Sequence, residues 1–357
     1  MKYNENGTPK KNTLSMQLDL SKFEPATEED KRQQDVMSES TSFFRDGMKK
    51  LFKNPLSVIS LILLAIVIIT IIVAPMIVPY GYSQIISVEG KRDQGAKNLA
   101  PFTWSEAEQA YIDKGGKLFP HIFGTDSMCR DYFIRCVYGT RVSLFIGLFA
   151  SLIVLVIGVI WGSISGYVGG KTDLIMMRIV DIIYALPDML IIILLSVVLD
   201  SLLSANSTGI VAQLGSNMIS IFIVFGLLYW VGMARLIRGQ ILSIKSNDYI
   251  LAARSIGAKP SRIIKKHILP NCISVIIIST TLQIPSAIFT ESFLSFVGLG
   301  VQAPMPSLGS LANAAREGLQ SYPSKLVFPA VIICIIVLSL NLLGDGLRDA
   351  FDPKLRR

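Results

Sequence analysis

The 357-residue sequence has few charged residues for its length. Asp, Glu, Lys and Arg make up 17%, against about 25% in soluble domains, while hydrophobic residues make up 51%. The hydrophobic residues stand in long runs, and several runs exceed the roughly 18 residues that mark a membrane-spanning helix. These features exclude a disordered chain and argue against an ordinary soluble enzyme. They predict an all-α protein that crosses a membrane several times.

Cysteine and histidine are also scarce. The four cysteines have no CxxC or other metal-binding spacing, and the two histidines, His121 and His267, are far apart in the sequence. If the segment around Cys129 and Cys136 is helical, their Cα atoms lie roughly 10 Å apart, which is too far for a disulfide. We therefore expect no metal site.

Catalytic patterns are missing as well. The GGKT sequence at 169–172 resembles the end of a phosphate-binding loop, but Ser165 stands where the first glycine is needed. The GLGVQA sequence at 298–303 follows an apolar run, and two prolines then block the helix that a dinucleotide site requires. We predict that the chain is not an enzyme and binds no cofactor.

Six apolar segments predict six transmembrane helices. Residues 1–54 are a polar N-terminal tail, in which 43–53 predicts an amphipathic helix on the membrane surface or else a solvated linker. The first transmembrane helix is expected within 55–79, followed by a loop at 80–141. The rest of the predicted organisation is a core at 142–343, with helices at about 142–168, 174–198, 217–236, 273–297 and 326–343, a loop at 237–271, and a tail at 344–357.

The charge distribution predicts the orientation. The segment 235–270 holds eight Lys and Arg residues but one acid, Asp248, whereas 199–216 holds no Lys or Arg. Positively charged loops stay in the cytoplasm. This rule places the 237–271 loop and both termini in the cytoplasm and the 80–141 loop outside the cell. The positive charge of a loop beside a membrane usually serves to set the orientation of the protein, so we predict no nucleic-acid partner.

Small residues share one face of the second predicted span. Their spacings of four and seven keep them on that face, where they allow a second helix to approach closely. The pattern predicts either tight structural packing or a face that slides during gating. The residues are Gly147, Ser151, Gly158, Gly162, Gly166 and Gly170.

Several polar residues fall inside the predicted spans. Charges there are costly, so they pair, reach the membrane surface or face water. Arg178 and Asp181 are three residues apart, which allows them to pair on one helix face. Glu291 lies about 31 Å along a helix from Pro270, which predicts a polar vestibule at the outer surface. The candidates for a translocation path are Asp188, Gln283, Glu291, Ser292 and Ser295.

The 248–271 segment predicts an exposed helical hairpin. Asp248 is placed to cap a first short helix, Gly257 to end it, and Pro260 to begin a second one. A compact knob of this kind suits docking into a groove of a soluble partner, with Ala252 and Ala253 allowing close approach.

This segment resembles the EAA loop of ABC-importer permeases, whose pattern is EAA-x3-G-x9-I-x-LP. Ala252, Ala253, Gly257, Leu269 and Pro270 match at full spacing, while Leu251 stands where the family has Glu and His267 where it has Ile. In that family the loop is the coupling helix that sits in a cleft of the ATPase subunit. The resemblance implies an ATPase-coupling loop formed by Asp248, Ala252, Ala253, Gly257, Arg262, His267, Leu269 and Pro270.

Other segments are similar to the dipeptide and oligopeptide branch of that family, C type. They are FGTDSMCRDYFIRCVYGTRVSL at 123–144, RIVDIIYALPDML at 178–190, ESFLSFVGLGVQAPMPSLGSL at 291–311 and GDGLRDAFDPKLR at 344–356. The resemblance implies a type I ABC-importer permease fold in the cell membrane. It also implies peptide import by alternating access.

The resemblance further implies the partners. They are a second permease subunit, two cytoplasmic ATPases that use ATP and Mg²⁺, an extracellular solute-binding protein that delivers the peptide, and the lipid bilayer. One alternative is a member of the same family that imports nickel or another small solute. An alternative of a different class is a self-contained channel or secondary transporter, which needs polar residues through several spans, whereas spans one and six are almost purely apolar.

Overall fold

The computed structural model describes residues 43–204, 215–301 and 305–351. The chain forms two units, Met1–Asp46 and Gly47–Arg357. The described part of the first unit is the beginning of helix α2 (Phe43–Lys53), whose bounds coincide with the predicted amphipathic helix. The rest of the predicted N-terminal tail lies outside the described residues. The architecture below is that of the second unit.

Five helical stretches in the described residues are long and apolar enough to cross a membrane. Three are the single helices α3 (Pro55–Ile77), α5 (Tyr132–Val168) and α15 (Ser324–Phe351). The fourth consists of α9 (Ser216–Val224), a π-helical turn (Phe225–Tyr229) and α10 (Trp230–Ile244). The fifth, Pro260–Val297, ends in α13 (Ile273–Val297), whose bounds are those of the predicted fifth span. The predicted all-α membrane fold is confirmed.

Several of these stretches are longer than the predicted spans. The fourth continues to Ile244, past the predicted end at 236 and into the predicted loop at 237–271. Helix α5 begins at Tyr132, inside the predicted outer loop, because Asp131 caps it and accepts a hydrogen bond from the Ile134 amide at 2.9 Å. Helix α15 continues to Phe351, beyond the predicted end at 343. Hydropathy detects the apolar part of a helix, whereas its caps determine where the helix ends.

The third predicted span, at about 174–198, consists of two helices in the structure. Helix α6 (Gly170–Ala185) and helix α7 (Asp188–Ser204) follow one another at a bend of 91°. Pro187 stands at the break. Proline lacks an amide hydrogen and its ring clashes with the preceding turn, so a helix kinks or ends there. The bent pair counts as a sixth span if both halves cross together.

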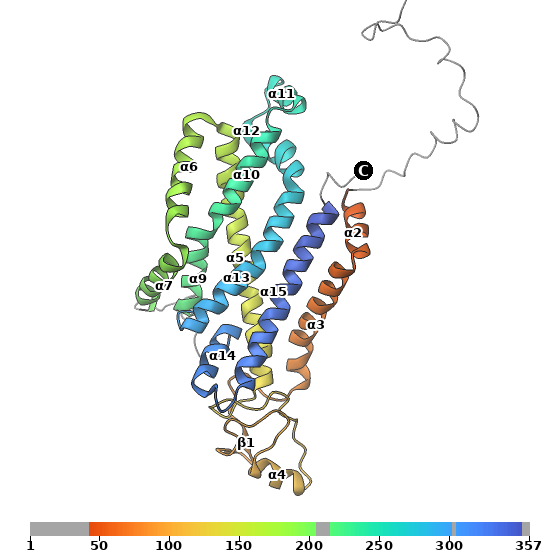
Figure 1. Cartoon of the computed structure of the whole chain (residues 1–357), viewed down its shortest axis with the longest axis vertical. Helices are drawn as coiled ribbons and strands as arrows, with labels where there is room; N and C mark the ends of the chain where they lie inside the picture. The colour runs from red at the N-terminus through yellow and green to blue at the C-terminus, as the bar shows by residue number, and fades with distance from the viewer. Residues whose placement is uncertain (1–42, 205–214, 302–304, 352–357) are drawn as a thin grey trace, which may run out of the picture. The chain divides into compact units, whose positions relative to one another are not determined.

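The bundle is organised around α5. Helices α10 and α13 pack along α5, α15 packs on α13, and α3 packs on α15 (Figure 1). Helix α6 lies on the flank of the bundle away from α3 (Figure 1). Helix α14 (Leu308–Ala315) contacts α13 and α15. Buried residues of α5, α10 and α13 form the main apolar core.

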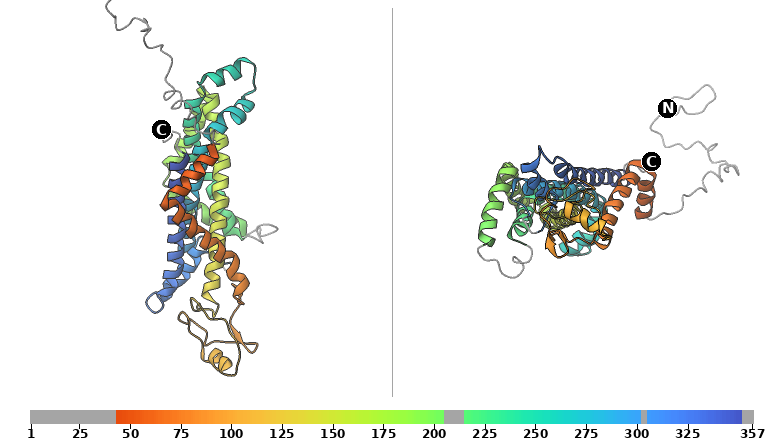
Figure 2. Two further views of the ribbon diagram at one scale, coloured as in Figure 1. Left: turned by 90° about the vertical axis from the view of Figure 1, so that its right-hand side faces the viewer. Right: turned by 90° about the horizontal axis from the view of Figure 1, so that it is seen from below.

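The two ends of the bundle carry different structures. At one end lie α11 (Asp248–Ser255) and α12 (Pro260–Ile263), and at the other lies the segment between α3 and α5 (Figures 1 and 2). That segment contains the two-stranded sheet of β1 (Ser87–Val88) and β2 (Lys91–Arg92), paired antiparallel, and helix α4 (Glu106–Asp113).

Four glycines of the predicted small-residue face lie between helices. A Cβ atom on Gly162 would stand 2.5 Å from the Ala234 carbonyl oxygen of α10, and Gly158 and Gly166 have similarly close neighbours there. A Cβ on Gly147 would instead meet Ile288 of α13. Ser151 is buried and its hydroxyl donates to the Leu148 carbonyl, whereas Gly170 would have no atom within 4 Å of a Cβ. Because these glycines have no side chains, the α5 and α10 backbones can approach each other closely.

Replacing Gly162 with alanine should therefore weaken the bundle. The added methyl group has no room, and overpacking of this kind costs about 1–3 kcal/mol. Gly239→Ala on α10 is the matched control because a Cβ there has no atom of this chain within 4 Å. We expect Gly162→Ala to lower the unfolding temperature of the purified protein and Gly239→Ala to leave it unchanged or higher. Equal unfolding temperatures would contradict the packing role.

Candidate functional site

The loop between α10 and α13 begins with a short helix that glycine ends. Asn247, not Asp248, is the residue that precedes α11, with extended backbone (φ −69°, ψ 146°), and Asp248 is the first helical residue. Gly257 has φ +79°, a conformation that favours glycine, and no atom would lie within 4 Å of a Cβ there. The sequence thus correctly identified the stop signal but misplaced the cap by one residue.

The second half of the loop is not a separate short helix. After α12, a π-helical turn (Ile264–Ile268) and a 3-10 turn (Leu269–Cys272) lead directly into α13. Pro270 stands inside the 3-10 turn, where it cannot donate a backbone hydrogen bond. Its ring also crowds the preceding turn, and the wider π-helical turn there is consistent with this crowding. The loop and α13 therefore form one continuous, irregular helical path.

Apolar side chains fix this loop to the bundle. Ile250, Ala253, Ile263 and Ile268 are all buried in the main apolar core. Ala253 therefore faces the bundle, whereas Ala252 is exposed. Of the two alanines expected to allow a partner's approach, only Ala252 is exposed on the surface of this chain.

The exposed side of the loop is apolar at its tip. Ile256 is 85% exposed and Leu251 is 46% exposed, and Tyr249 is exposed beside them. Three exposed apolar side chains within eight residues of one short loop are a candidate surface for contact with another protein. The sequence did not indicate the exposure of Ile256, because the direction of its side chain depends on how Ile250 and Ala253 pack.

Basic and polar side chains surround this tip. Arg262, Lys265 and Lys266 are exposed, and His267 is partly buried. The Arg254 guanidinium lies 5.3 Å from the centre of the Tyr167 ring of α5. The Asn271 amide donates to the His267 carbonyl at 2.6 Å. The loop therefore presents an apolar tip within a positively charged surface.

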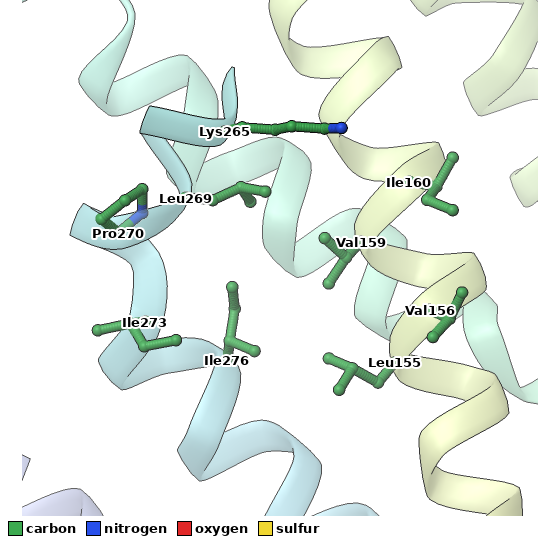
Figure 3. Close-up of a pocket in the computed structure, with 9 residues that line it drawn as sticks. All are labelled: Leu155, Val156, Val159, Ile160, Lys265, Leu269, Pro270, Ile273 and Ile276. Carbon is green, nitrogen blue, oxygen red and sulfur yellow. The ribbon is translucent and has the colours of Figure 1, made fainter. Parts of the chain in front are cut away.

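An apolar hollow of about 630 Å³ lies below the second half of the loop. Figure 3 shows Leu269, Pro270, Ile273 and Ile276 on the loop and α13 side, facing Leu155, Val156, Val159 and Ile160 of α5, with Lys265 extended across the top. Leu269 and Pro270, which carry part of the EAA pattern, thus stand where the loop joins the membrane helices.

Three residues predicted to line a translocation path lie together inside the chain. Glu291 is fully buried, and the hydroxyls of Ser143 and Ser295 donate to its carboxylate at 2.8 and 2.7 Å. Ser292 is also buried, with its hydroxyl 3.3 Å from the Glu291 carboxylate. This group joins α5 to α13 and is not an exposed vestibule. Contact of these residues with a transported solute stays a prediction.

The other two candidates lie elsewhere. Gln283 is partly buried in the middle of α13. Asp188 is the first residue of α7, directly after the break at Pro187, and its side chain lies outside the described residues. The structure does not bring Gln283 into the Glu291 group.

Asp181 pairs with a different residue from the one expected. Arg235 of α10 donates to Asp181 of α6 at 2.7 Å, and Arg178 makes no ion pair within the described part of the chain. Closer to the α11 end, Arg238 makes two hydrogen bonds to Asp173, at 2.6 and 2.7 Å. Two ion pairs therefore join α6 to α10, which nothing in the local sequence indicated.

A buried histidine organises the segment between α3 and α5. His121 is fully buried, with Nδ1 2.8 Å from Asp131 and Nε2 2.9 Å from Glu108. Burial lowers the pKa of His121, but the hydrogen bonds to the two carboxylates outweigh it and raise that pKa to about 9. The charged ring thus joins α4 to the residue that caps α5. The sequence did not indicate the two partners of His121, because Glu108 and Asp131 reach it only through the fold.

Among the described residues, no group of three or more His, Cys, Asp or Glu side chains is arranged to hold a metal ion. All four cysteines are free thiols, and Cys334 is the exposed one.

Comparison with known families identifies two matching segments. Residues 158–357 match the family described as binding-protein-dependent transport system inner membrane component. Residues 42–101 match the family described as the N-terminal TM domain of oligopeptide transport permease C. The two matches together include the first span, the last part of α5, the helices from α6 to α15 and the loop described above.

Relatives with assigned names extend over nearly the whole chain. The oligopeptide transport system permease protein of Bacillus subtilis (strain 168) is 41% identical over 335 residues, 94% of this chain and 97% of that protein. The dipeptide transport system permease protein of the same organism is 40% identical and covers 92% of each chain. The glutathione transport system permease protein of Pectobacterium atrosepticum is 40% identical over 66% of this chain and 73% of its own.

The charge on His121 predicts that the stability of the segment between α3 and α5 depends on pH. Because the pKa is raised from 6.5 to about 9, the stabilisation is complete below about pH 6.5 and is lost as the pH rises through 9. The shift corresponds to about 3 kcal/mol. We expect protease cleavage within residues 80–131 to accelerate at least tenfold between pH 6.5 and 9.5, measured on the purified protein.

The variant His121→Gln provides the control for this experiment. It removes the titrating group, so its cleavage should be faster at pH 6.5 and should change little with pH. Wild-type cleavage that is independent of pH would contradict the charged state of His121.

Proposed function

Because the chain belongs to the family of inner-membrane components of binding-protein-dependent transport systems, we propose that it is the permease subunit of an ATP-driven importer of peptides. The observation that supports peptides as the substrate is the similarity, over nearly the full length, to permeases named for oligopeptides and dipeptides. As a transport component of this family, the chain moves solute across the membrane and does not itself perform the chemistry of ATP hydrolysis.

The α11–α12 loop is the proposed ATPase-docking element. Its exposed apolar tip, Ile256, suits insertion into a cleft of a soluble subunit, and its buried residues Ile250 and Ala253 hold the tip in a fixed place. The continuous path from α12 into α13 supports transmission of movement from the docked tip to the membrane helices. In this proposal the ATPases bind ATP and Mg²⁺, and this chain binds neither.

The proposed orientation puts the α11 end in the cytoplasm. Lys245, Arg254, Lys259 and the neighbouring basic residues gather at this end, as the positive-inside rule requires of a cytoplasmic loop. Both termini are then cytoplasmic, and the segment containing α4 and His121 faces outside. That segment is the proposed contact of the solute-binding protein.

The complete importer, in this proposal, contains a second homologous permease and two ATPases. Large apolar side chains are exposed along α3, α5 and α6, and in the assembled importer they face lipid or the second permease. ATP binding closes the ATPases and opens the passage outward, and hydrolysis returns the passage to the inward-facing state. The passage thus has two states, and the state of the ATPases determines which of them is favoured.

The substrate class is tested by uptake. We expect cells without this gene to lose uptake of labelled dipeptides and tripeptides, and a plasmid-borne wild-type copy to restore it. Nickel uptake measured in parallel should be unchanged. Lost nickel uptake with intact peptide uptake would keep the family and overturn the substrate.

Docking is tested at the loop tip. Ile256→Asp places a charge where an apolar contact is proposed, so we expect at least tenfold weaker capture of the ATPase subunits and a matching loss of peptide uptake. Ser243→Asp adds the same charge at an exposed position of α10 outside the loop and should behave as wild type. Normal uptake by Ile256→Asp at normal membrane levels would refute the docking role.

A further inference from the structure

A polar hollow of about 400 Å³ lies at the end of the bundle that carries α4. The segment that leads into α5 lines one side of it, and the turn between α14 and α15 lines the other (Figure 1). Ser127, Glu317 and Ser321 in its lining are exposed, so the hollow is open on one side. The volume is within the roughly 300–1,000 Å³ of small-ligand sites.

Positive charge exceeds negative charge in the lining of this hollow. Lys97 and Glu317 are exposed, so water and salt screen their charges. The other charged side chains of the lining are buried or partly buried, and they include three cations but a single carboxylate. The cations are Arg130, Arg135 and Lys325, and the carboxylate is that of Asp126.

Asp126 is already satisfied by its own segment. One carboxylate oxygen accepts from the backbone amides of Met128 and Arg130 at 2.8 and 2.9 Å, and the other accepts from the Arg130 Nε at 2.7 Å. The Arg135 Nε lies 3.4 Å from that second oxygen and has no hydrogen-bond partner among the described residues, although Arg135 is only 7% exposed. Asp126 therefore balances one arginine and leaves a buried donor of the other available.

Lys325, the second residue of α15, adds another buried positive charge. It is 8% exposed and makes no ion pair within the parts of the chain that the structure describes. Its ammonium group donates to the Asn98 side-chain oxygen and lies 4.6 Å from the centre of the Tyr322 ring. An ammonium group has three hydrogens to donate, and a buried charge without a counter-charge destabilises a fold.

From this arrangement we propose that the hollow binds a small, doubly charged anion of the dicarboxylate or phosphate class, held by Arg135 and Lys325. Three cations and one carboxylate leave two positive charges, which such an anion balances. A guanidinium group is a planar donor that matches the oxygens of carboxylates and phosphates, and an ammonium group adds a charged donor.

The bound anion connects two distant parts of the chain. It joins the segment before α5 to the start of α15, where the Tyr132 hydroxyl already donates to the Lys325 carbonyl at 2.6 Å. The site is therefore expected to stabilise this end of the bundle when it is occupied. The proposal does not depend on which solute the protein transports.

The experiment measures thermal unfolding of the purified full-length chain. Succinate and inorganic phosphate are the two probes, and each is compared with chloride at the same ionic strength, so that screening of exposed charges is equal. We expect at least one probe to raise the unfolding temperature by about 3 °C when its concentration exceeds its Kd tenfold. The probe that binds more tightly identifies the dicarboxylate or the phosphate class.

Lys325→Gln removes the buried charge and keeps a donor for Asn98. In chloride, this variant should unfold at the wild-type temperature or higher, because an unbalanced buried charge is gone. It should bind the probe at least tenfold more weakly. Lys114→Gln is the matched control, because Lys114 belongs to the same segment but is 71% exposed, and it should bind the probe as wild type does. Lower stability of Lys325→Gln in chloride with an unchanged Kd would make Lys325 a purely structural residue and overturn the proposal.

Glu317→Gln changes the affinity in the opposite direction. It removes an exposed carboxylate from the lining, so we expect the probe to bind at least twofold more tightly at low ionic strength. Binding that is unchanged or weaker would contradict an anion in this hollow.

Two further outcomes would also count against the site. Equal temperature shifts in wild type and Lys325→Gln would reflect the general exclusion of such anions from protein surfaces. Stabilisation by a pentaglutamate peptide, and by neither small anion, would assign the cations to an acidic segment of another protein.

Discussion

Close approach of backbones along α5 is the constraint on which the rest of the bundle depends. Lipid solvates apolar side chains as well as a neighbouring helix does, so helices associate where small residues let them approach closely. Gly158, Gly162 and Gly166 bring α10 to one part of α5, and Gly147 brings α13 to another. The α11–α12 loop connects α10 to α13, so α5 holds the loop at both of its ends. The position of the loop tip, Ile256, therefore follows from glycines within the membrane helices.

Features that depend on neighbouring residues could be predicted from the sequence. The bounds of α13, the stop at Gly257 and the small-residue face of α5 each follow from composition or spacing within one helix or turn. Features that depend on distant residues could not. The partner of Asp181 is 54 positions away. The partners of His121 approach it only when the segment between α3 and α5 folds, and the exposure of Ile256 results from the burial of Ile250. Periodicity and hydropathy contain no information about such pairs.

Three buried or half-buried carboxylates indicate how polar groups serve this protein. Glu291 is satisfied by serines of its own and the adjacent helix, and Glu108 by a charged histidine, so each contributes to a fixed contact. Asp181 has a partner but remains half exposed. The two enclosed carboxylates therefore hold segments of the chain together inside the fold, whereas Asp181 joins α6 to α10 at the surface of this chain.

The pairing of Asp181 with Arg235 also has a consequence for biosynthesis. The ribosome completes α6 before α10 exists, so Asp181 enters the membrane 54 residues ahead of its partner. Asp181 is the twelfth of the 16 residues of α6, and a charged residue in a span is costly until it finds a partner or water. The ion pair that joins α6 to α10 therefore forms only after α10 has been made, so the packing of α6 is completed late in synthesis.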